Sequence, residues 1–286
     1  MSALNAALTL LGTGTSSGVP VIGCDCATCQ STDPRDKRLR TGAMLQFTDA
    51  TGQPRVILID VPPDHREQSL RAGIDRCDAI LITHGHVDHV FGLDEVRRYN
   101  AMMRQPIPVY ADNETWEQLE RVYRHIFFRK ENKNDSFVAS LTQQRVEHGT
   151  QLNLHGISAT AFTLMHGRLP ILGWRFDSPN ADPLFPIAYC TDVNHIPNES
   201  WPFLEGINTL ILDMLRPRAH PTHFTCDQAI ATAEKIAAKQ TIFVHMTHDL
   251  LHGEFDPTLP SGMRLGFDSM KISSPRTHAC PPPKIR

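Results

Sequence analysis

The chain has 286 residues, a formal net charge of −3 and an ordinary hydrophobic content of 41%. This length can bury a sizeable core in one large domain or two small ones. The weak negative charge gives no electrostatic reason to expect nucleic acid as a partner. No apolar run approaches the roughly 20 residues that cross a bilayer, and the start MSALNAALTLLGTG lacks the basic region of a signal peptide. We therefore expect a soluble, cytoplasmic protein without a membrane partner.

Short apolar runs rich in β-branched residues predict strands at Ala7–Leu11, Val56–Ile59, Ala79–Thr83, Ile107–Tyr110 and Thr241–Val244. Each run ends where glycine, proline, aspartate or histidine accumulates. Helical spacing of apolar residues covers Asn113–Lys130, and a capping-box signature at Thr225 and Gln228 precedes a helix over Cys226–Lys239. We predict a single α/β domain with mixed sheets over residues 1–272. A flexible, proline-rich tail is expected over 273–286.

A thiol cluster follows the first predicted strand, where Cys24, Cys26 and Cys29 form the pattern C-x-C-x2-C. A disulfide between such close partners would be strained, and the expected compartment is reducing. Three thiolates instead favour one structural Zn²⁺, for which His248 in FVHMTHDL is the best fourth ligand. Two alternatives stay open: a fourth ligand from His252, Asp25 or water, or three free thiols in a loop.

The densest group of metal-binding side chains lies in ITHGHVDHVFG, directly after a predicted strand. His84 and His86 are two residues apart, so an extended chain directs both to the same side. Asp88 and His89 come at the turn into the next helix and can approach from another direction. Imidazole and carboxylate groups at this spacing could hold two cations side by side. The alternative is a polar loop whose histidines only cap a helix.

Three further candidates end apolar runs elsewhere in the chain: His166 follows AFTLM, Asp192 follows IAYCT, and His245 follows TIFV. Any one of them alone is more often a loop residue with an ordinary hydrogen bond. Because strand ends meet at one edge of an α/β fold, we expect all three to join the loop at residues 84–89. Two cations held there could bind a hydroxide between them as a nucleophile at neutral pH.

The H-x-H-x-D-H loop with a later His, Asp and His resembles the metallo-β-lactamase superfamily. That resemblance implies an αββα sandwich, in which two mixed β-sheets are flanked by helices. It also implies two catalytic divalent metals, Mn²⁺ or Zn²⁺, at a dinuclear site. The first metal would be bound by His84, His86 and His166. The second would be bound by Asp88, His89 and His245, with Asp192 bridging the pair.

Within that superfamily, LGTGTSSGVPVIGCDCATC, ILITHGHVDHVFGLDEVR and LPSGMRLGFDSMKI are similar to the cyclic phosphodiesterases of the bacterial carbon–phosphorus lyase pathway (PhnP-like). The resemblance implies a small-molecule phosphodiester substrate of the 5-phosphoribosyl 1,2-cyclic phosphate type. His223, before a predicted helix, matches an additional active-site histidine of that family, although it could instead belong to the cap region. His223 and Asp88 are the candidate catalytic residues, and we expect Asp60 to hydrogen-bond a metal ligand.

Several further residues are weaker candidates for binding phosphate. Phosphate donors could come from Gly12, Gly14, Ser16 and Ser17, although tight turning also explains the glycines. A second phosphate could be bound by Arg168, Arg216 and Arg218, or these arginines could only solvate a surface. The segment around Trp116–Ser140 is longer than the resemblance implies. It could cover the pocket or form an oligomer contact, so a homodimer is possible.

Two other classes of function compete with this prediction. Other hydrolases share the dinuclear core, namely tRNA 3′ endonucleases and thioester or lactone hydrolases. The endonucleases grip tRNA with a protruding basic arm, and no Lys/Arg/Gly-rich insertion of that kind occurs in this sequence. The pyrroloquinoline-quinone biosynthesis B protein offers a non-enzymatic alternative, a binding module with a similar cysteine cluster. It lacks the intact histidine loop, so the complete ligand set here favours an enzyme.

Overall fold

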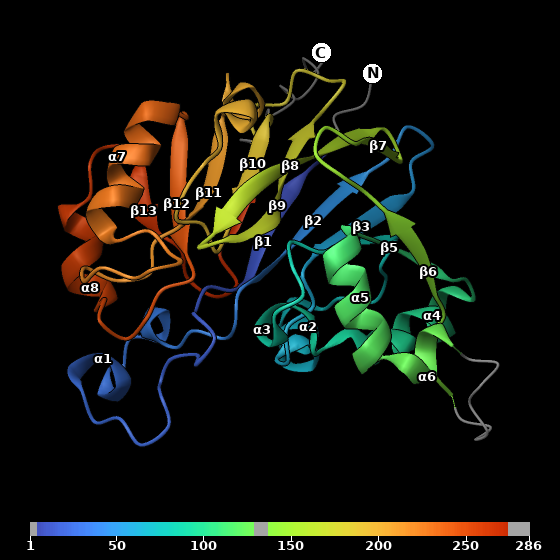
Figure 1. Ribbon diagram of the computed structural model, residues 1–286, viewed down its shortest axis with the longest axis horizontal. Helices are drawn as coiled ribbons and strands as arrows, with labels where there is room; N and C mark the ends of the chain where they lie inside the picture. Colours follow the sequence, from blue (N-terminus) through green and yellow to red (C-terminus); the bar gives the residue numbers. More distant parts are fainter. Residues whose placement is uncertain (1–4, 129–136, 274–286) are drawn as a thin grey trace, which may run out of the picture.

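The computed structural model describes residues 5–128 and 137–273. Two seven-stranded sheets pack face to face, and helices lie on the outer face of each sheet (Figure 1). This is the αββα sandwich that the resemblance implied. No helix in the described ranges is long and apolar enough to cross a membrane.

The first sheet contains the N-terminal strands and, at one edge, the last strand of the chain. Its order is β14-β1-β2-β3-β4-β5-β6. Strands β14, β1, β2 and β3 pair antiparallel, and β3 to β6 pair parallel. The bounds are β1 Ala7–Gly12, β2 Gly42–Thr48, β3 Pro54–Ile59, β4 Ala79–Leu81, β5 Ile107–Ala111, β6 Leu141–Arg145 and β14 Lys271–Ser273.

The second sheet has the order β13-β12-β11-β10-β9-β8-β7. Strands β7 to β10 form an antiparallel meander, and β10 to β13 are parallel. The bounds are β7 Gln151–Leu154, β8 Ile157–His166, β9 Leu169–Asp177, β10 Ile187–Cys190, β11 Thr209–Asp213, β12 Gln240–Val244 and β13 Met263–Leu265.

Helices cover the outer faces and connect the parallel strands. On the second sheet this layer is α7, drawn in orange, and on the first sheet it is the teal and green group α2 to α6 (Figure 1). The bounds are α1 Ala27–Gln30, α2 His65–Ala72, α3 Val87–Val90, α4 Arg97–Met103, α5 Asn113–Val122, α6 Arg124–Phe127, α7 Cys226–Ile236 and α8 His252–Phe255.

Strand periodicity explains why several runs are apolar throughout. Successive strand residues point to opposite faces, so Ile57 and Ile59 enter the core between the sheets while Leu58 enters the core under the helices. In β12, Ile242 and Phe243 divide in the same way between the inter-sheet core and the α7 side. Both faces of the central strands are buried, and this leaves the strand ends and their loops for polar chemistry.

The predicted elements differ from the structure mainly at their ends. The helix predicted over Asn113–Lys130 breaks at Tyr123, whose backbone (φ −105°, ψ 38°) separates α5 from α6, and its last two residues lie outside the described ranges. The predicted Cys226–Lys239 helix ends at Ile236, because Ala237 adopts a left-handed conformation. The capping box of Thr225 and Gln228 is confirmed by both of its hydrogen bonds.

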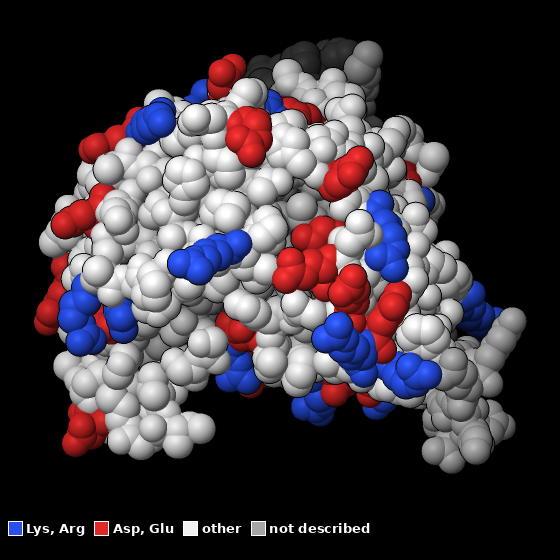
Figure 2. All heavy atoms as spheres, viewed as in Figure 1, with Lys and Arg blue, Asp and Glu red and all other residues white. Residues whose placement is uncertain are grey.

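The predicted boundary between the domain and the tail, at residue 273, falls within β14. Ser273 belongs to β14 and pairs with Ala7 of β1, so the ladder extends past the predicted boundary. The rest of that prediction, 274–286, lies outside the described ranges. On the face shown in Figure 2, acidic and basic side chains are interspersed over the surface instead of forming one broad basic area.

Candidate metal centre

The predicted metal ligands meet at one edge of the sandwich, because their strands end there. His84 and His86 follow β4, His166 is the last residue of β8, Asp192 follows β10, and His245 follows β12. Asp192 and His245 have positive φ angles of 56° and 63°. Such left-handed backbone is unfavourable for residues with a Cβ, and it concentrates at functional sites. Here it turns each side chain out of its strand and into the shared space.

Three histidines form the first ligand group. Donor atoms of His84, His86 and His166 all lie within 4.8 Å of one another. The ring centroids are 4.5 Å apart for His84 and His86, and 5.1 Å apart for His86 and His166. A set of three imidazoles with an open side is typical of a catalytic metal site.

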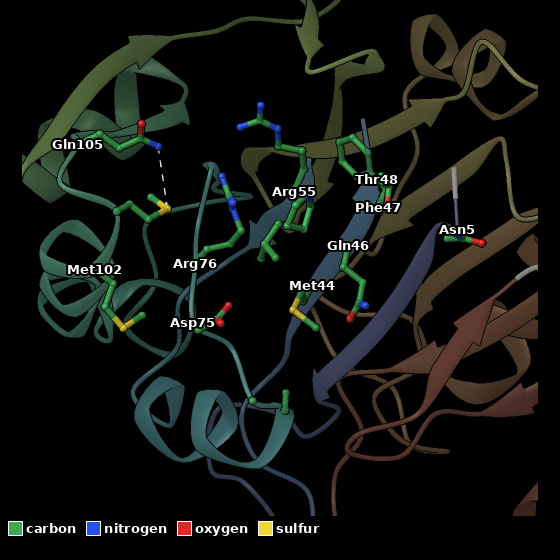
Figure 3. A pocket seen from close by; sticks show the side chains of 15 residues that line it. Asn5, Met44, Gln46, Phe47, Thr48, Arg55, Asp75, Arg76, Met102 and Gln105 are labelled. Carbon is green, nitrogen blue, oxygen red and sulfur yellow. Dashed lines mark hydrogen bonds between the residues drawn. The ribbon is translucent and has the colours of Figure 1, made fainter. Parts of the chain in front are cut away.

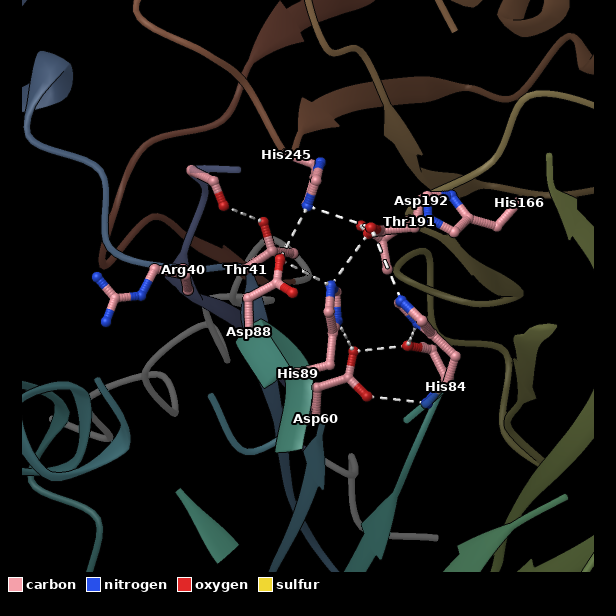
Figure 4. Close-up of polar contacts among 12 residues, drawn as sticks. Arg40, Thr41, Asp60, His84, Asp88, His89, His166, Thr191, Asp192 and His245 are labelled. Atoms are coloured by element: carbon pink, nitrogen blue, oxygen red, sulfur yellow. Dashed lines mark hydrogen bonds and ion pairs between the residues drawn. The ribbon is translucent and has the colours of Figure 1, made fainter. Parts of the chain in front are cut away.

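The second group combines two carboxylates with two imidazoles: Asp88, His89, Asp192 and His245. Asp192 is central, with its oxygens 3.3 Å from His89 Nε2 and 3.2 Å from His245 Nε2. It also lies 3.9 Å from His84 Nε2 of the first group, so one carboxylate faces both groups (Figure 4). This is the position that a bridging ligand requires.

Buried nitrogens without hydrogen bonds show that this set fits cations. In the described part of the chain, Nε2 of His84, His89 and His245 is buried and has no hydrogen-bond partner. An unpaired buried polar atom costs free energy, and native proteins rarely leave one unexplained. Divalent metal ions would accept these lone pairs, and the histidine and carboxylate donors suit first-row metals.

Hydrogen bonds from outside the cluster set the orientation of the imidazoles. His89 Nδ1 lies 2.7 Å from Asp60, which also accepts from the backbone N–H and hydroxyl of Thr83 at 2.8 Å. His166 Nδ1 donates to the Thr222 carbonyl at 2.9 Å. Each ring therefore turns Nε2 toward the centre. The predicted contact of Asp60 with a ligand histidine is confirmed.

Carboxylates and burial shift the histidine pKa values in opposite directions. Burial, reinforced by the neighbouring imidazoles, lowers the pKa of His84 well below its ordinary value. Burial also disfavours the charged form of His89, but Asp192 and Asp60 outweigh it and raise the pKa of that ring well above its ordinary value. The cluster thus holds its negative charge on carboxylates beside imidazoles, as a cation site needs.

Asp213 belongs to this site although it is not among the residues predicted from the sequence. It is the last residue of β11 and fully buried, and its oxygens lie 3.2 Å from His223 Nδ1 and 3.5 Å from His245 Nδ1. Burial raises the pKa of Asp213 well above that of an ordinary carboxyl. A usable signal was present: TLILD ends an apolar run with an acid, the rule that identified Asp192.

His223 lies beside the ligand cluster, as the predicted role requires. Its ring centroid is 4.6 Å from that of His166 and 4.8 Å from that of His245. Burial lowers its pKa. Since Nδ1 faces Asp213, Nε2 is the ring nitrogen left for a substrate.

His248 lies against the three thiols of the cysteine cluster. Its Nδ1 lies 3.2, 3.4 and 3.5 Å from the sulfurs of Cys24, Cys26 and Cys29. Tetrahedral Zn²⁺ with ordinary bond lengths separates nitrogen and sulfur ligands by about 3.6 Å, so the four groups fit a structural zinc. His252 instead donates its backbone N–H to Asp36, and Asp25 is exposed.

Short segments of chain connect the candidate dinuclear site with the cluster of Cys24, Cys26, Cys29 and His248. Met246, between His245 and His248, pairs with Gly14 of the loop after β1 and donates to the Thr13 carbonyl at 3.0 Å. A Cβ on Gly14 would crowd the Arg38 backbone and side chain. The glycine there is therefore explained by close packing of the chain against Arg38, which differs from both the phosphate role and the tight turn considered from the sequence.

A cavity of about 290 Å³ adjoins the metal centre. His223 and His248 contribute to its wall, as do four of the weaker phosphate candidates, Ser16, Ser17, Arg216 and Arg218. Arg168 is not among the lining residues. A larger cavity of about 780 Å³ lies at the outer face of the first sheet, between its strands and the α2 and α4 side (Figure 3). None of the predicted ligands lines that larger cavity.

The described part of Trp116–Ser140 packs on the ligand loop. Trp116 is fully buried and donates from Nε1 to the Gln144 carbonyl. A Cβ on Gly85, between His84 and His86, would overlap the Gln118 side chain of α5. Helix α5 therefore supports the loop that carries the ligands. Residues 129–136 of this segment lie outside the described ranges.

Comparison with known proteins agrees with this geometry. Residues 55–246 match the family model of the beta-lactamase superfamily domain. The crystal structure of a new diphosphatase from the PhnP family is 42% identical, with a TM-score of 0.81, covering 93% of this chain and 96% of that one.

Two curated relatives are similar over smaller shares of their own length. An octanoyltransferase of Porphyromonas gingivalis is 37% identical over 264 residues, 92% of this chain but 50% of the relative. The coenzyme PQQ synthesis protein B of Methylobacterium nodulans is 29% identical over 173 residues, 57% of this chain and 53% of the relative. The chain therefore spans about half the length of each of these two proteins.

Proposed function

Because this chain belongs to the metallo-β-lactamase superfamily, is PhnP-like within it and is thus a metal-dependent hydrolase, we propose that it cleaves a phosphodiester bond in a small molecule. A cyclic phosphate of the 5-phosphoribosyl 1,2-cyclic type is the proposed substrate. The observation that carries the proposal is the pair of ligand groups that share Asp192 and lie beside His223 and a cavity with two arginines.

The proposed ligand assignment follows the two groups. His84, His86 and His166 would hold one divalent metal, Mn²⁺ or Zn²⁺, and Asp88, His89 and His245 would hold the second. Asp192 would be a ligand common to both. Cys24, Cys26, Cys29 and His248 would hold the structural Zn²⁺.

Each group of this chain then has a distinct task. When bound, two divalent cations lower the pKa of water and neutralise charge on phosphate oxygens. Water adds to phosphorus and releases a proton to solvent, the bond from phosphorus to the ester oxygen breaks, and that oxygen takes up a proton. Asp213 accepts from His223 Nδ1, and His223 supplies the proton from Nε2. Asp88 takes part as a proposed ligand of the second metal. Its carboxylate lies 3.5 Å from both His89 Nε2 and His245 Nε2.

The test is hydrolysis by protein reconstituted with Mn²⁺ or Zn²⁺. We expect turnover of bis(p-nitrophenyl) phosphate and of 5-phosphoribosyl 1,2-cyclic phosphate. Replacing Asp192 with Ala should lower kcat at least 10³-fold, because both metal sites lose a ligand. Absence of turnover with every metal would overturn the proposal and favour a binding module like the PQQ synthesis protein B.

Two relatives suggest rival substrates for the same centre. The PhnP-family neighbour is named a diphosphatase, which favours a phosphoric anhydride. The Porphyromonas relative is named an octanoyltransferase, which favours an octanoyl thioester. Assays with a nucleoside diphosphate ester, an octanoyl thioester and a tRNA precursor would separate these substrates from the cyclic phosphate.

We further propose that the enzyme works in the cytoplasm on a small molecule, not on nucleic acid, and that it forms a homodimer.

A further inference from the structure

Three loops that are distant in sequence enclose the cavity beside His223. They are the loop after β1 with Ser16 and Ser17, the loop after β11 with Arg216 and Arg218, and the turn after β12 with Thr247 to Asp249. The volume of about 290 Å³ is at the small end of ligand sites. Since His223 lies in its wall and against His166 and His245, a molecule at the metal centre could extend directly into it.

The arginines make this cavity cationic, and they differ in how far they are neutralised. Arg218 Nη2 lies 3.3 Å from Asp249, the one carboxylate in the lining. Within the described ranges, the Arg216 side chain donates hydrogen bonds only to the carbonyls of Arg218 and Ala219, both at 3.4 Å, and no carboxylate pairs with it. Its guanidinium therefore keeps a full charge and unused donors at the cavity, in a form suited to bidentate binding of phosphate.

The loop after β1 supplies small hydroxyl groups to the same cavity. Ser16 and Ser17 are exposed to the cavity, and Ser17 donates only a long 3.2 Å hydrogen bond to the adjacent Gly18 carbonyl. A tetrahedral anion in this cavity would meet the charge of the arginines and the hydroxyl donors of the serines. The lining offers no extended apolar surface for an acyl chain, since Val21 and Leu215 are its only aliphatic members.

The geometry points to this cavity as the binding site for a second, non-reacting phosphoryl group of the substrate, with Arg216 as its principal partner. The inference rests on the proposed function and narrows it. The substrate would carry two phosphoryl groups, one cleaved at the metal centre and one held by the three loops. Arg216 would therefore determine specificity without touching the reacting atoms.

The first experiment measures specificity in the metal-loaded full chain. The ratio of kcat/KM for 5-phosphoribosyl 1,2-cyclic phosphate to that for ribose 1,2-cyclic phosphate is compared between wild type and Arg216→Gln. We expect the ratio to fall roughly ten-fold or more, because a hydrogen-bonded charge pair is lost. The matched control is Arg98→Gln, an exposed arginine of α4 outside this cavity, which should leave the ratio unchanged. An unchanged ratio in Arg216→Gln overturns the inference.

The second experiment does not depend on hydrolysis, so it separates failure of this inference from failure of the proposed function. Binding of ribose 5-phosphate to the metal-loaded protein is measured by calorimetry. Arg216→Gln should weaken it roughly ten-fold or more. Asp249→Asn should tighten it, because Arg218 loses its competing partner. Equal binding by wild type and Arg216→Gln would place the probe at the metals and refute the site, whether or not any substrate is hydrolysed.

Discussion

Asp213 contacts two imidazoles of the candidate site, those of His223 and His245. The carboxyl is buried between the Nδ1 atoms of His223 and His245, and its Oδ2 also accepts from the Phe224 backbone N–H at 3.1 Å. One side chain thus orients both a proposed metal ligand and the proposed proton donor. An ionised Asp213 favours the charged form of His223 and so opposes the effect of burial, which lowers the pKa of that ring. The charged form is the one that a general acid needs.

Asp213→Asn tests this arrangement with little change of shape. We expect kcat for bis(p-nitrophenyl) phosphate to fall about 100-fold, because the amide does not stabilise a protonated His223. Metal content, measured by plasma mass spectrometry, should stay close to wild type, since every proposed metal ligand is still present. Asp75→Asn, an exposed aspartate remote from the ligands, is the control. Full kcat in Asp213→Asn would show that His223 acts without it.

Among the elements, the long loop between β1 and β2 has little regular structure yet is held firmly. Arg38 is almost completely buried, and its guanidinium donates to the carbonyls of Thr247 at 2.7 Å and Leu250 at 2.6 Å, and to Asp36 at 3.0 Å. The thiols on the same loop close on His248. Both attachments join the loop to the segment after β12, next to His245.

Cys24→Ser with Cys26→Ser tests the second attachment. We expect the double variant to bind one equivalent of zinc less than wild type, because two of four ligands lose their thiolates. The remaining metals should stay bound. Cys280→Ser, outside the described ranges, is the matched control. A double variant that binds as much metal as wild type would rule out the structural zinc.

At the scale of the whole molecule, the sandwich buries titratable groups that also link its stability to pH. His65 is 1% exposed, and its Nε2 lies 3.2 Å from the Ser69 hydroxyl and 3.1 Å from the Tyr99 hydroxyl, under the first sheet's helices. Burial lowers the pKa of His65 to about 4. The unfolded chain therefore binds a proton here more readily than the native protein does.

The sign of the pH dependence follows from that difference. The contribution of His65 to stability is complete above its ordinary pKa of about 6.5 and is lost as the pH falls toward 4, by up to about 3 kcal/mol. Urea unfolding from pH 7 to pH 4.5 should therefore show a shallower loss of free energy in His65→Asn than in wild type. Identical slopes would mean that His65 is protonated in the native state as easily as in the unfolded chain.

Much of this protein could be derived from its sequence. Strand runs such as Val56–Ile59, the capping box before α7 and the crowded loop at His84–His89 are local patterns, set by side-chain periodicity and by hydrogen bonds a few residues apart. The positions of the later candidate ligands were also predictable, because His166, Asp192 and His245 each end an apolar run. Local chemistry of this kind predicted an α/β domain with mixed sheets and the candidate metal centre, whereas the αββα sandwich was implied by the family resemblance.

Tertiary structure alone decided the remaining features. It selected His248 over His252 beside the thiols, placed Asp213 between two imidazoles, and packed Gln118 against Gly85. It also brought Arg216 and Ser17 to one cavity from loops about two hundred residues apart. These contacts depend on how two sheets are stacked and which strand ends coincide. No short stretch of sequence contains that information, because each partner alone would be satisfied by water.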